Sequence, residues 1–127
     1  MKIENIKLSE RAKSHLITLK RRTGIEHWNT LCRWAFCLSL REPSKPPQEN
    51  IPADSSVEMS WKVFGGQNAD VYLALLKERA HQDNYELTDK NISEYFRLHL
   101  HRGISYLANH SNVSDIASLL RLTAPTE

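Results

Sequence analysis

Hydrophobic residues recur at helical spacing over most of the chain and alternate only in two short stretches. Residues 9–23 have their apolar positions on one face, namely Ala12, Leu16 and Leu19 with His15 beside them. Ser9 has the side chain of a helix N-cap, and Gly24 can take the left-handed conformation that ends a helix. The pattern predicts an amphipathic helix whose outer face is cationic.

Residues 26–40 are apolar around nearly the whole circumference of a second predicted helix. Its main stripe consists of Trp28, Leu31, Cys32, Ala35 and Leu38, whereas Trp34, Phe36, Cys37 and Leu40 point elsewhere. Such a helix is buried on several sides, and in a chain of 127 residues part of that burial is expected to come from another subunit. We therefore predict that four residues anchor the core or an oligomer interface: Trp28, Leu31, Trp34 and Phe36.

Two stretches predict β-strands, of which the first is residues 4–8, with Ile6 and Leu8 on one face. In residues 57–64 the positions Val57, Met59, Trp61 and Val63 alternate with Glu58, Ser60, Lys62 and Phe64, which predicts a half-buried strand. Gly65-Gly66 then predicts a turn. No phosphate-binding glycine motif is present, so nucleotide binding there is not expected.

Between these segments lies a proline-rich connection, residues 41–56, which contains Pro43, Pro46, Pro47 and Pro52. Its composition predicts an extended, exposed segment. Loops of this length are either functional or spacers, and both interpretations stay open.

Three further helices are predicted, over residues 68–82, 91–109 and 114–122. The first should bury Val71, Tyr72, Leu75 and Leu76. The second should bury Ile92, Tyr95, Phe96, His99, Leu100, Gly103 and Leu107. The prediction is a mainly α protein with a short β-strand or hairpin, forming a single domain over residues 1–127.

Charge is distributed unevenly, although the net charge is only +2. Residues 1–41 contain nine Lys or Arg and three Asp or Glu, whereas residues 42–127 contain eight and twelve. A basic patch for an anionic partner fits this asymmetry. A solvated helix face fits it as well, and charge alone favours that simpler interpretation.

Candidate chemistry is sparse. Cys32 and Cys37 would lie about 140° apart around a helix, which suits neither a disulfide nor a shared metal, so reduced and mostly buried thiols are expected. His99 and His101 would lie about 200° apart, with His99 buried and His101 exposed. Glu26 is better placed in the first turn of the second helix than in acid–base chemistry with a neighbouring histidine. No catalytic residue, metal or cofactor is expected.

The absence of a long apolar run argues against a membrane span or signal peptide and favours a cytoplasmic protein. Cations on an exposed helix instead suit the phosphates of nucleic acid, because they neutralise backbone charge and release counterions. The candidate DNA-binding residues are Lys7, Lys13, Lys20, Arg21 and Arg22.

Four long blocks resemble the DndE family of the bacterial DNA phosphorothioation system. They are LKRRTGIEHWNTLCRWAFCLSL at residues 19–40, SVEMSWKVFGG at 56–66, VYLALLKERAHQD at 71–83 and FRLHLHRGISYLA at 96–108. The resemblance implies a small helical protein related to ribbon-helix-helix proteins. It also implies a homo-oligomer, expected to be a tetramer, that binds duplex DNA with a preference for nicks. Within the matched blocks lie Lys20, Arg21 and Arg22, whereas Lys7 and Lys13 are candidates by charge alone.

In that pathway sulfur replaces a non-bridging phosphate oxygen, and the resemblance implies an accessory subunit working beside the other phosphorothioation proteins. Ribbon-helix-helix repressors read the major groove with a β-ribbon, but the first strand here is short. Backbone contacts with little sequence specificity are therefore expected. The alternative is an assembly scaffold with secondary DNA binding, and a weaker alternative is a DNA nickase.

Overall fold

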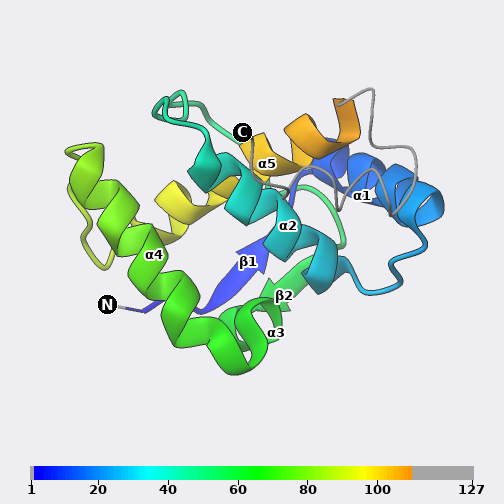
Figure 1. Cartoon of the computed structure of the whole chain (residues 1–127), viewed down its shortest axis with the longest axis horizontal. Helices are drawn as coiled ribbons and strands as arrows, with labels where there is room; N and C mark the ends of the chain where they lie inside the picture. Colours follow the sequence, from blue (N-terminus) through cyan, green and yellow to red (C-terminus); the bar gives the residue numbers. More distant parts are fainter. Residues whose placement is uncertain (1, 110–127) are drawn as a thin grey trace, which may run out of the picture.

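The computed structural model describes residues 2–109, which form a mainly helical fold with one two-stranded antiparallel sheet, as predicted (Figure 1). In chain order its elements are β1 (Asn5–Lys7), α1 (Glu10–Thr23), α2 (Trp28–Arg41), β2 (Glu58–Ser60), α3 (Trp61–Gly65), the 3-10 helix η1 (Gly66–Asn68), α4 (Ala69–Gln82) and α5 (Ile92–Asn109). The predicted helix at 114–122 lies outside the described residues. Within residues 2–109, no helix is both long and apolar enough to cross a membrane.

Helices α2 and α5 form the most extensive packing in the fold, with α5 running behind α2 in Figure 1. Gly103 makes their close approach possible, because a Cβ built on it would lie 1.8 Å from the Ala35 carbonyl oxygen. All seven residues predicted to be buried on α5 are buried. The prediction from helical periodicity was correct here because neighbouring elements cover the whole apolar face of α5.

An aromatic cluster fills the space between α2, α3 and α5. The ring centroids of Phe36 and Phe96 are 5.0 Å apart, and those of Phe64 and Phe96 are 4.9 Å apart. Trp61 stacks on Phe64 at 5.1 Å. Phe36, Phe64 and Phe96 have no exposed surface, so the cluster forms the centre of the core.

Helix α1 has the ends that its sequence predicts. The Ser9 hydroxyl accepts a hydrogen bond from the Ala12 amide at 3.1 Å. Gly24 has φ of 74°, and its amide donates to the Lys20 carbonyl. Ala12, Leu16 and Leu19 are buried, which leaves the charged side of α1 facing outward.

The second strand is much shorter than predicted. β2 pairs with β1 so that Ile6 lies opposite Met59, but it ends at Ser60, whose hydroxyl accepts from the Val63 amide and caps α3. The turn into α3 reverses the predicted faces, so Phe64 is fully buried and Val63 is 52% exposed. The alternating pattern was therefore wrong beyond Ser60, because an N-cap ended the strand.

Within the described chain, β1 takes its strand partner from the same chain. The ribbon of a ribbon-helix-helix repressor is instead formed between subunits. The relation of this fold to those repressors stays a prediction.

Two other helices differ from prediction in detail. Helix α4 buries Leu76, Arg79 and Ala80, whereas Val71 is 56% and Leu75 43% exposed, so the predicted buried stripe was partly wrong. The reason is that α4 packs on α3 and η1 through a neighbouring face, which periodicity alone does not identify. Helix α2 begins at Trp28, and this leaves Glu26 in the preceding turn instead of the first helical turn.

The two cysteines differ from each other in burial. Cys32 is buried as expected, and burial raises its pKa to about 12. Cys37 is exposed, contrary to expectation.

Three arginines hold the proline-rich connection through its backbone carbonyls. Arg79 donates to the carbonyls of Leu40, Glu42 and Ser44. Arg102 donates to the carbonyls of Ser39 and Ser44, and Arg97 donates to those of Lys7, Ile51 and Pro52. Most side chains of the connection are exposed, as predicted, although Pro46 and Ser55 are buried. The path of the connection is therefore set by the guanidinium groups of α4 and α5.

The guanidinium of Arg79 is itself held by an ion pair with Asp83 at 3.1 Å. Asp83 also accepts a hydrogen bond from the Tyr95 hydroxyl at 2.6 Å. The carbonyls of Ser39 and Leu40 belong to the last turn of α2, where cations are favoured by the helix dipole. One buried polar network thus connects α2, α4 and α5.

His101 is part of the fold, although the sequence predicted it to be exposed. Its Nδ1–H donates to the Arg97 carbonyl at 2.8 Å, and its Nε2 accepts from the Ser9 amide at 3.2 Å. Burial lowers the pKa of His101 to about 4. The neutral ring therefore joins α5 to the start of α1, a tertiary contact that its neighbours in sequence do not reveal.

His99 is fully buried, as predicted. Its Nδ1 lies 2.8 Å from the Ser39 hydroxyl, which also accepts from Arg102 Nε. The serine hydrogen is then directed to Nδ1, which places the ring proton on Nε2. Burial, followed by the positive charges of Arg102 and Arg79, lowers the pKa of His99 to about 4.

Replacing Gly103 with Ala should lower the free energy of unfolding by about 3 kcal/mol or more, because the new methyl group meets the α2 backbone, which has no rotamer to change. Urea denaturation followed by circular dichroism measures the loss. Ser93→Ala on the same helix is the control and should change stability by less than about 0.5 kcal/mol. Equal stability of the two variants would contradict the close α2–α5 contact.

Stability should fall as pH is lowered from about 7 to about 5. His99 and His101 have folded-state pKa values of about 4, below the unfolded value of about 6.5, so the stability they provide is present above pH 6.5 and is lost as pH falls towards 4. We expect a loss of roughly 2 kcal/mol after allowance for solvent screening. Urea denaturation across this range should give a shallower profile for His101→Gln, whereas His81→Gln at an exposed position should keep the wild-type slope.

Candidate nucleic-acid interface

The last turn of α1 carries the strongest positive charge of the candidate interface, from Lys20, Arg21 and Arg22. All three side chains are exposed. Arg22 Nη1 donates to the Ala108 carbonyl at 3.2 Å, whereas Lys20 and Arg21 have no side-chain partner among residues 2–109. Two cations are therefore free to contact an anionic ligand.

Lys13 lies on the same face of α1 as Lys20, since seven residues complete nearly two helical turns and span about 10 Å. Exposed Ile17 lies between them in sequence, with 46% of its surface accessible. Lys13 is half-buried, and its Nζ donates to the Ser56 hydroxyl at 2.8 Å and lies 4.0 Å from Glu10. Its charge is therefore less available than that of Lys20.

Lys7 is not brought together with the last turn of α1. It lies in β1, before the start of the helix, and α1 is about 20 Å long. Its direct partner across the strand pair is Glu58, whose charge offsets its own. Lys7 is thus the weakest member of the predicted set.

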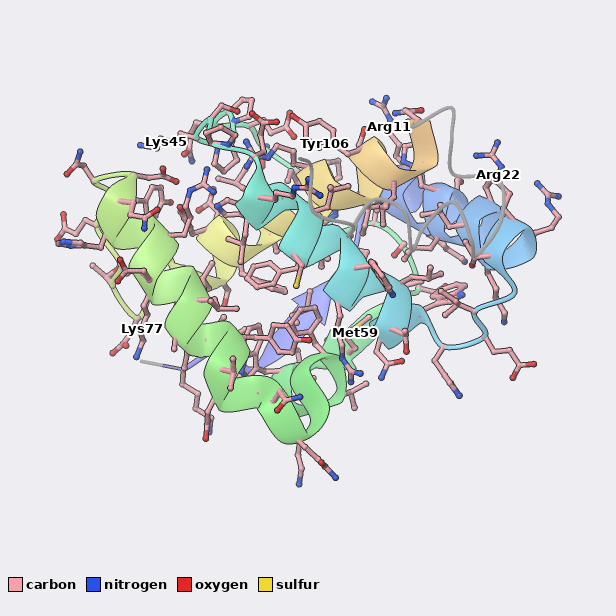
Figure 2. All side chains as sticks on the ribbon, in the orientation of Figure 1. Arg11, Arg22, Lys45, Met59, Lys77 and Tyr106 are labelled. Atoms are coloured by element: carbon pink, nitrogen blue, oxygen red, sulfur yellow. The ribbon has the colours of Figure 1, made fainter. Side chains whose placement is uncertain are left out.

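Arg11 extends the set, although the candidate residues chosen from the sequence did not include it. Arg22 follows Arg11 by eleven positions, or about three helical turns, so the two side chains share one side of α1 (Figure 2). Arg22 contacts α5 through the Ala108 carbonyl, and His15 lies between the two arginines in sequence. Burial, followed by the charge of Arg11, lowers the pKa of His15. The spacing of Arg11, His15 and Arg22 could have indicated this second face.

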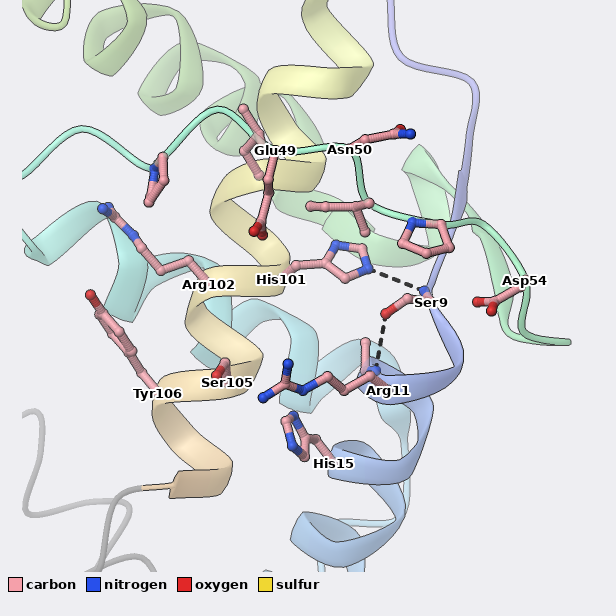
Figure 3. A pocket seen from close by; sticks show the side chains of 15 residues that line it. Ser9, Arg11, His15, Glu49, Asn50, Asp54, His101, Arg102, Ser105 and Tyr106 are labelled. Atoms are coloured by element: carbon pink, nitrogen blue, oxygen red, sulfur yellow. Dashed lines mark hydrogen bonds between the residues drawn. The ribbon is translucent and has the colours of Figure 1, made fainter.

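A cavity of about 500 Å³ lies on that second face, and we name it the α1–α5 cavity (Figure 3). It is bounded by α1, α5 and the proline-rich connection, through residues that include Arg11, His15, Glu49, Ile51, His101 and Tyr106. Arg11 and His15 line this cavity, whereas Lys13 and Lys20 lie about 180° away around α1 and do not line it.

The predicted anchors of the core or an oligomer interface fall into two groups. Leu31 and Phe36 have no exposed surface and serve the core of the chain itself. Trp28 and Trp34 are half-buried against that core. An interface role for the two tryptophans stays a prediction.

Three of the five large apolar side chains that are exposed among residues 2–109 lie on α3 and α4. Val63, Val71 and Leu75 are 52%, 56% and 43% exposed. Val71 and Leu75 are one turn apart on α4 and share a face. We name these three residues the α3–α4 apolar surface.

The candidate groups for acid–base catalysis, Glu26 and His27, are both exposed in the turn between α1 and α2. Among residues 2–109, no three His, Cys, Asp or Glu side chains are close enough to hold a metal ion.

Comparisons with known proteins agree with this fold. A family model described as DNA sulphur modification protein DndE matches residues 5–115. The crystal structure of DndE from Escherichia coli B7A, which is involved in DNA phosphorothioation modification, aligns with a TM-score of 0.70 and 24% identity, covering 84% of this chain and 98% of that one. A DndE mutant aligns with a TM-score of 0.65, 22% identity and the same coverages. None of the curated proteins compared with this chain matches it.

Because the family model matches most of the chain, this protein belongs to the DndE family of DNA sulphur modification proteins.

Proposed function

We propose that this chain is a non-catalytic accessory subunit of DNA phosphorothioation that binds the phosphate backbone of duplex DNA, with a preference for nicks. Membership of a DNA sulphur modification family supports DNA as the partner. The observation that carries the proposal is the exposed pair Lys20 and Arg21, which have no partner in the described chain. Backbone binding requires such unpaired cations but no base-reading groups.

The five candidate residues would contribute unequally. Lys20, Arg21 and Arg22 form one end of α1 and would make the main phosphate contacts. Lys13 would add to them after giving up its bond to Ser56, and Lys7 would contribute least because Glu58 lies opposite. The working form would be a homo-oligomer, which we expect to be a tetramer, so that these cations are repeated around the DNA.

An assembly role is the second candidate, and the α3–α4 apolar surface favours it. Exposed apolar residues that share a face often mark a protein–protein contact, and Val71 and Leu75 share one face of α4. In this function the surface would join copies of the chain or hold the other phosphorothioation proteins, with DNA binding secondary. The half-buried Trp28 and Trp34 would be additional contacts.

Changing Lys20, Arg21 and Arg22 together to Glu should weaken duplex binding by more than about tenfold at physiological salt, because phosphate contacts become repulsions. Fluorescence anisotropy over a salt series measures this. The slope of log affinity against log salt should become shallower by about 0.9 for each phosphate that the variant no longer neutralises.

The matched control changes three exposed lysines on other segments to Glu, namely Lys45, Lys62 and Lys77. It should retain nearly all duplex affinity. Equal loss of affinity in both variants would mean that only net charge matters, and an unchanged affinity of the α1 variant, with folding intact, would remove the proposal.

Supercoiled plasmid should stay supercoiled when it is incubated with the protein and a divalent metal. Conversion of the plasmid to open circles would instead indicate a nickase.

Replacing Val71 and Leu75 with Ser should leave the monomer fold within about 0.5 kcal/mol of wild type, because both side chains are largely exposed. If the α3–α4 apolar surface serves assembly, light scattering should show a smaller oligomer or pull-downs should show reduced capture of phosphorothioation proteins. Ile17→Ser removes a similarly exposed side chain from α1 and is the control. Unchanged assembly and capture would count against the second candidate.

A further inference from the structure

The α1–α5 cavity contains polar groups of two kinds. Ser9, His101 and Arg102 line it but are committed to hydrogen bonds within the fold. Other lining groups have no hydrogen bond or ion pair in the described chain: Arg11, His15, Glu49, Asn50 and Tyr106. The committed groups are fixed by bonds within the fold, while the uncommitted groups remain available to a ligand.

The uncommitted groups, of which Arg11 and Glu49 are charged, line different walls of the cavity. In Figure 3, Arg11 and His15 reach from α1 toward Ser105 on α5, whereas the Glu49 carboxylate reaches in from the proline-rich connection. A guanidinium on one wall and a carboxylate on another therefore face the same cavity, whereas Asp54 and Arg102, which also line it, are held by hydrogen bonds within the fold. A ligand that satisfies both must carry an anionic group and, some distance away, a set of hydrogen-bond donors.

The surface of the cavity is partly apolar. Ile51 and Pro52 come from the connection, and Leu98 comes from α5. Tyr106 lies at one margin, with its ring 6.0 Å from the Arg102 guanidinium. A flat ring can be buried against such a surface, and the volume of about 500 Å³ lies in the range of about 300–1,000 Å³ for small-ligand sites.

We propose that the α1–α5 cavity binds a nucleoside monophosphate, with its phosphate at Arg11, His15 and Ser105 and its base edge at Glu49. Guanine fits best, because its neighbouring N1–H and N2–H groups match the two oxygens of a carboxylate. The proposal rests on the proposed function, since a strand end bound along α1 would bring such a unit to Arg11. A free nucleotide has the same chemistry.

Guanosine monophosphate is the first probe, with guanosine and inorganic phosphate as its two halves. Isothermal titration calorimetry should show tighter binding of the whole nucleotide than of either half. Arg11→Gln should weaken nucleotide binding about tenfold or more, as expected for loss of a charge-assisted hydrogen bond. Glu49→Gln should weaken binding of the nucleotide but leave binding of inorganic phosphate unchanged. Lys77→Gln, on α4, should bind the nucleotide as tightly as wild type.

A second measurement locates the ligand. On addition of guanosine monophosphate, NMR signals of the His15 ring and the Ser105 amide should shift, and signals from α4 should not. No binding at millimolar nucleotide would overturn the proposal. Binding that is insensitive to both Arg11→Gln and Glu49→Gln would overturn it equally.

Duplexes with and without a single unpaired 5′-phosphoguanosine separate the two sources of the ligand. Tighter binding of the overhang, lost in Arg11→Gln, identifies a strand end, whereas equal binding with retained nucleotide affinity identifies a free nucleotide. The two proposals also fail separately. If only the cavity proposal is wrong, charge reversal at Lys20, Arg21 and Arg22 still weakens duplex binding. If the proposed function is wrong, that charge reversal leaves duplex affinity unchanged.

Discussion

The close approach of α2 and α5 is the contact on which the rest of the structure depends. It requires a residue without a side chain at Gly103, because the Ala35 carbonyl occupies the place where a Cβ would be. With the two backbones this close, Phe36 and Phe96 meet in the core, and Ser39 comes within hydrogen-bonding distance of His99 and Arg102. A wider spacing would separate these groups and leave buried polar atoms without partners, which is costly.

Side chains of α5 also position the segments at the surface. Arg97 and Arg102 project from α5 and bind carbonyls of the proline-rich connection, while His101 binds the start of α1. The connection and α1 are thereby both held against α5, and all three segments line the α1–α5 cavity. A long loop without regular structure is in this way given a defined path by side chains distant in sequence.

The two proposals assign a different role to each face of α1. Lys13 and Lys20 lie away from the α1–α5 cavity and suit the phosphates of a duplex backbone, whereas Arg11 lines the cavity and suits a group that enters it. Family membership supports a role in DNA sulphur modification. The second candidate surface, on α3 and α4, is apolar and lies on other elements, so DNA contact and assembly need not compete for the same residues.

Local signals in the sequence determined helices α1, α2, α4 and α5, the caps of α1 at Ser9 and Gly24, the buried face of α5 and the cationic side of α1. These follow from neighbours a few residues apart, since periodicity and capping are properties of a single segment. Only the tertiary structure decided the end of β2 at Ser60, the exposure of Val71 and Leu75, the bonds of His101 and the position of Arg11 beside a cavity. Each depends on which face meets which neighbour, and that information lies in contacts between segments far apart in the chain.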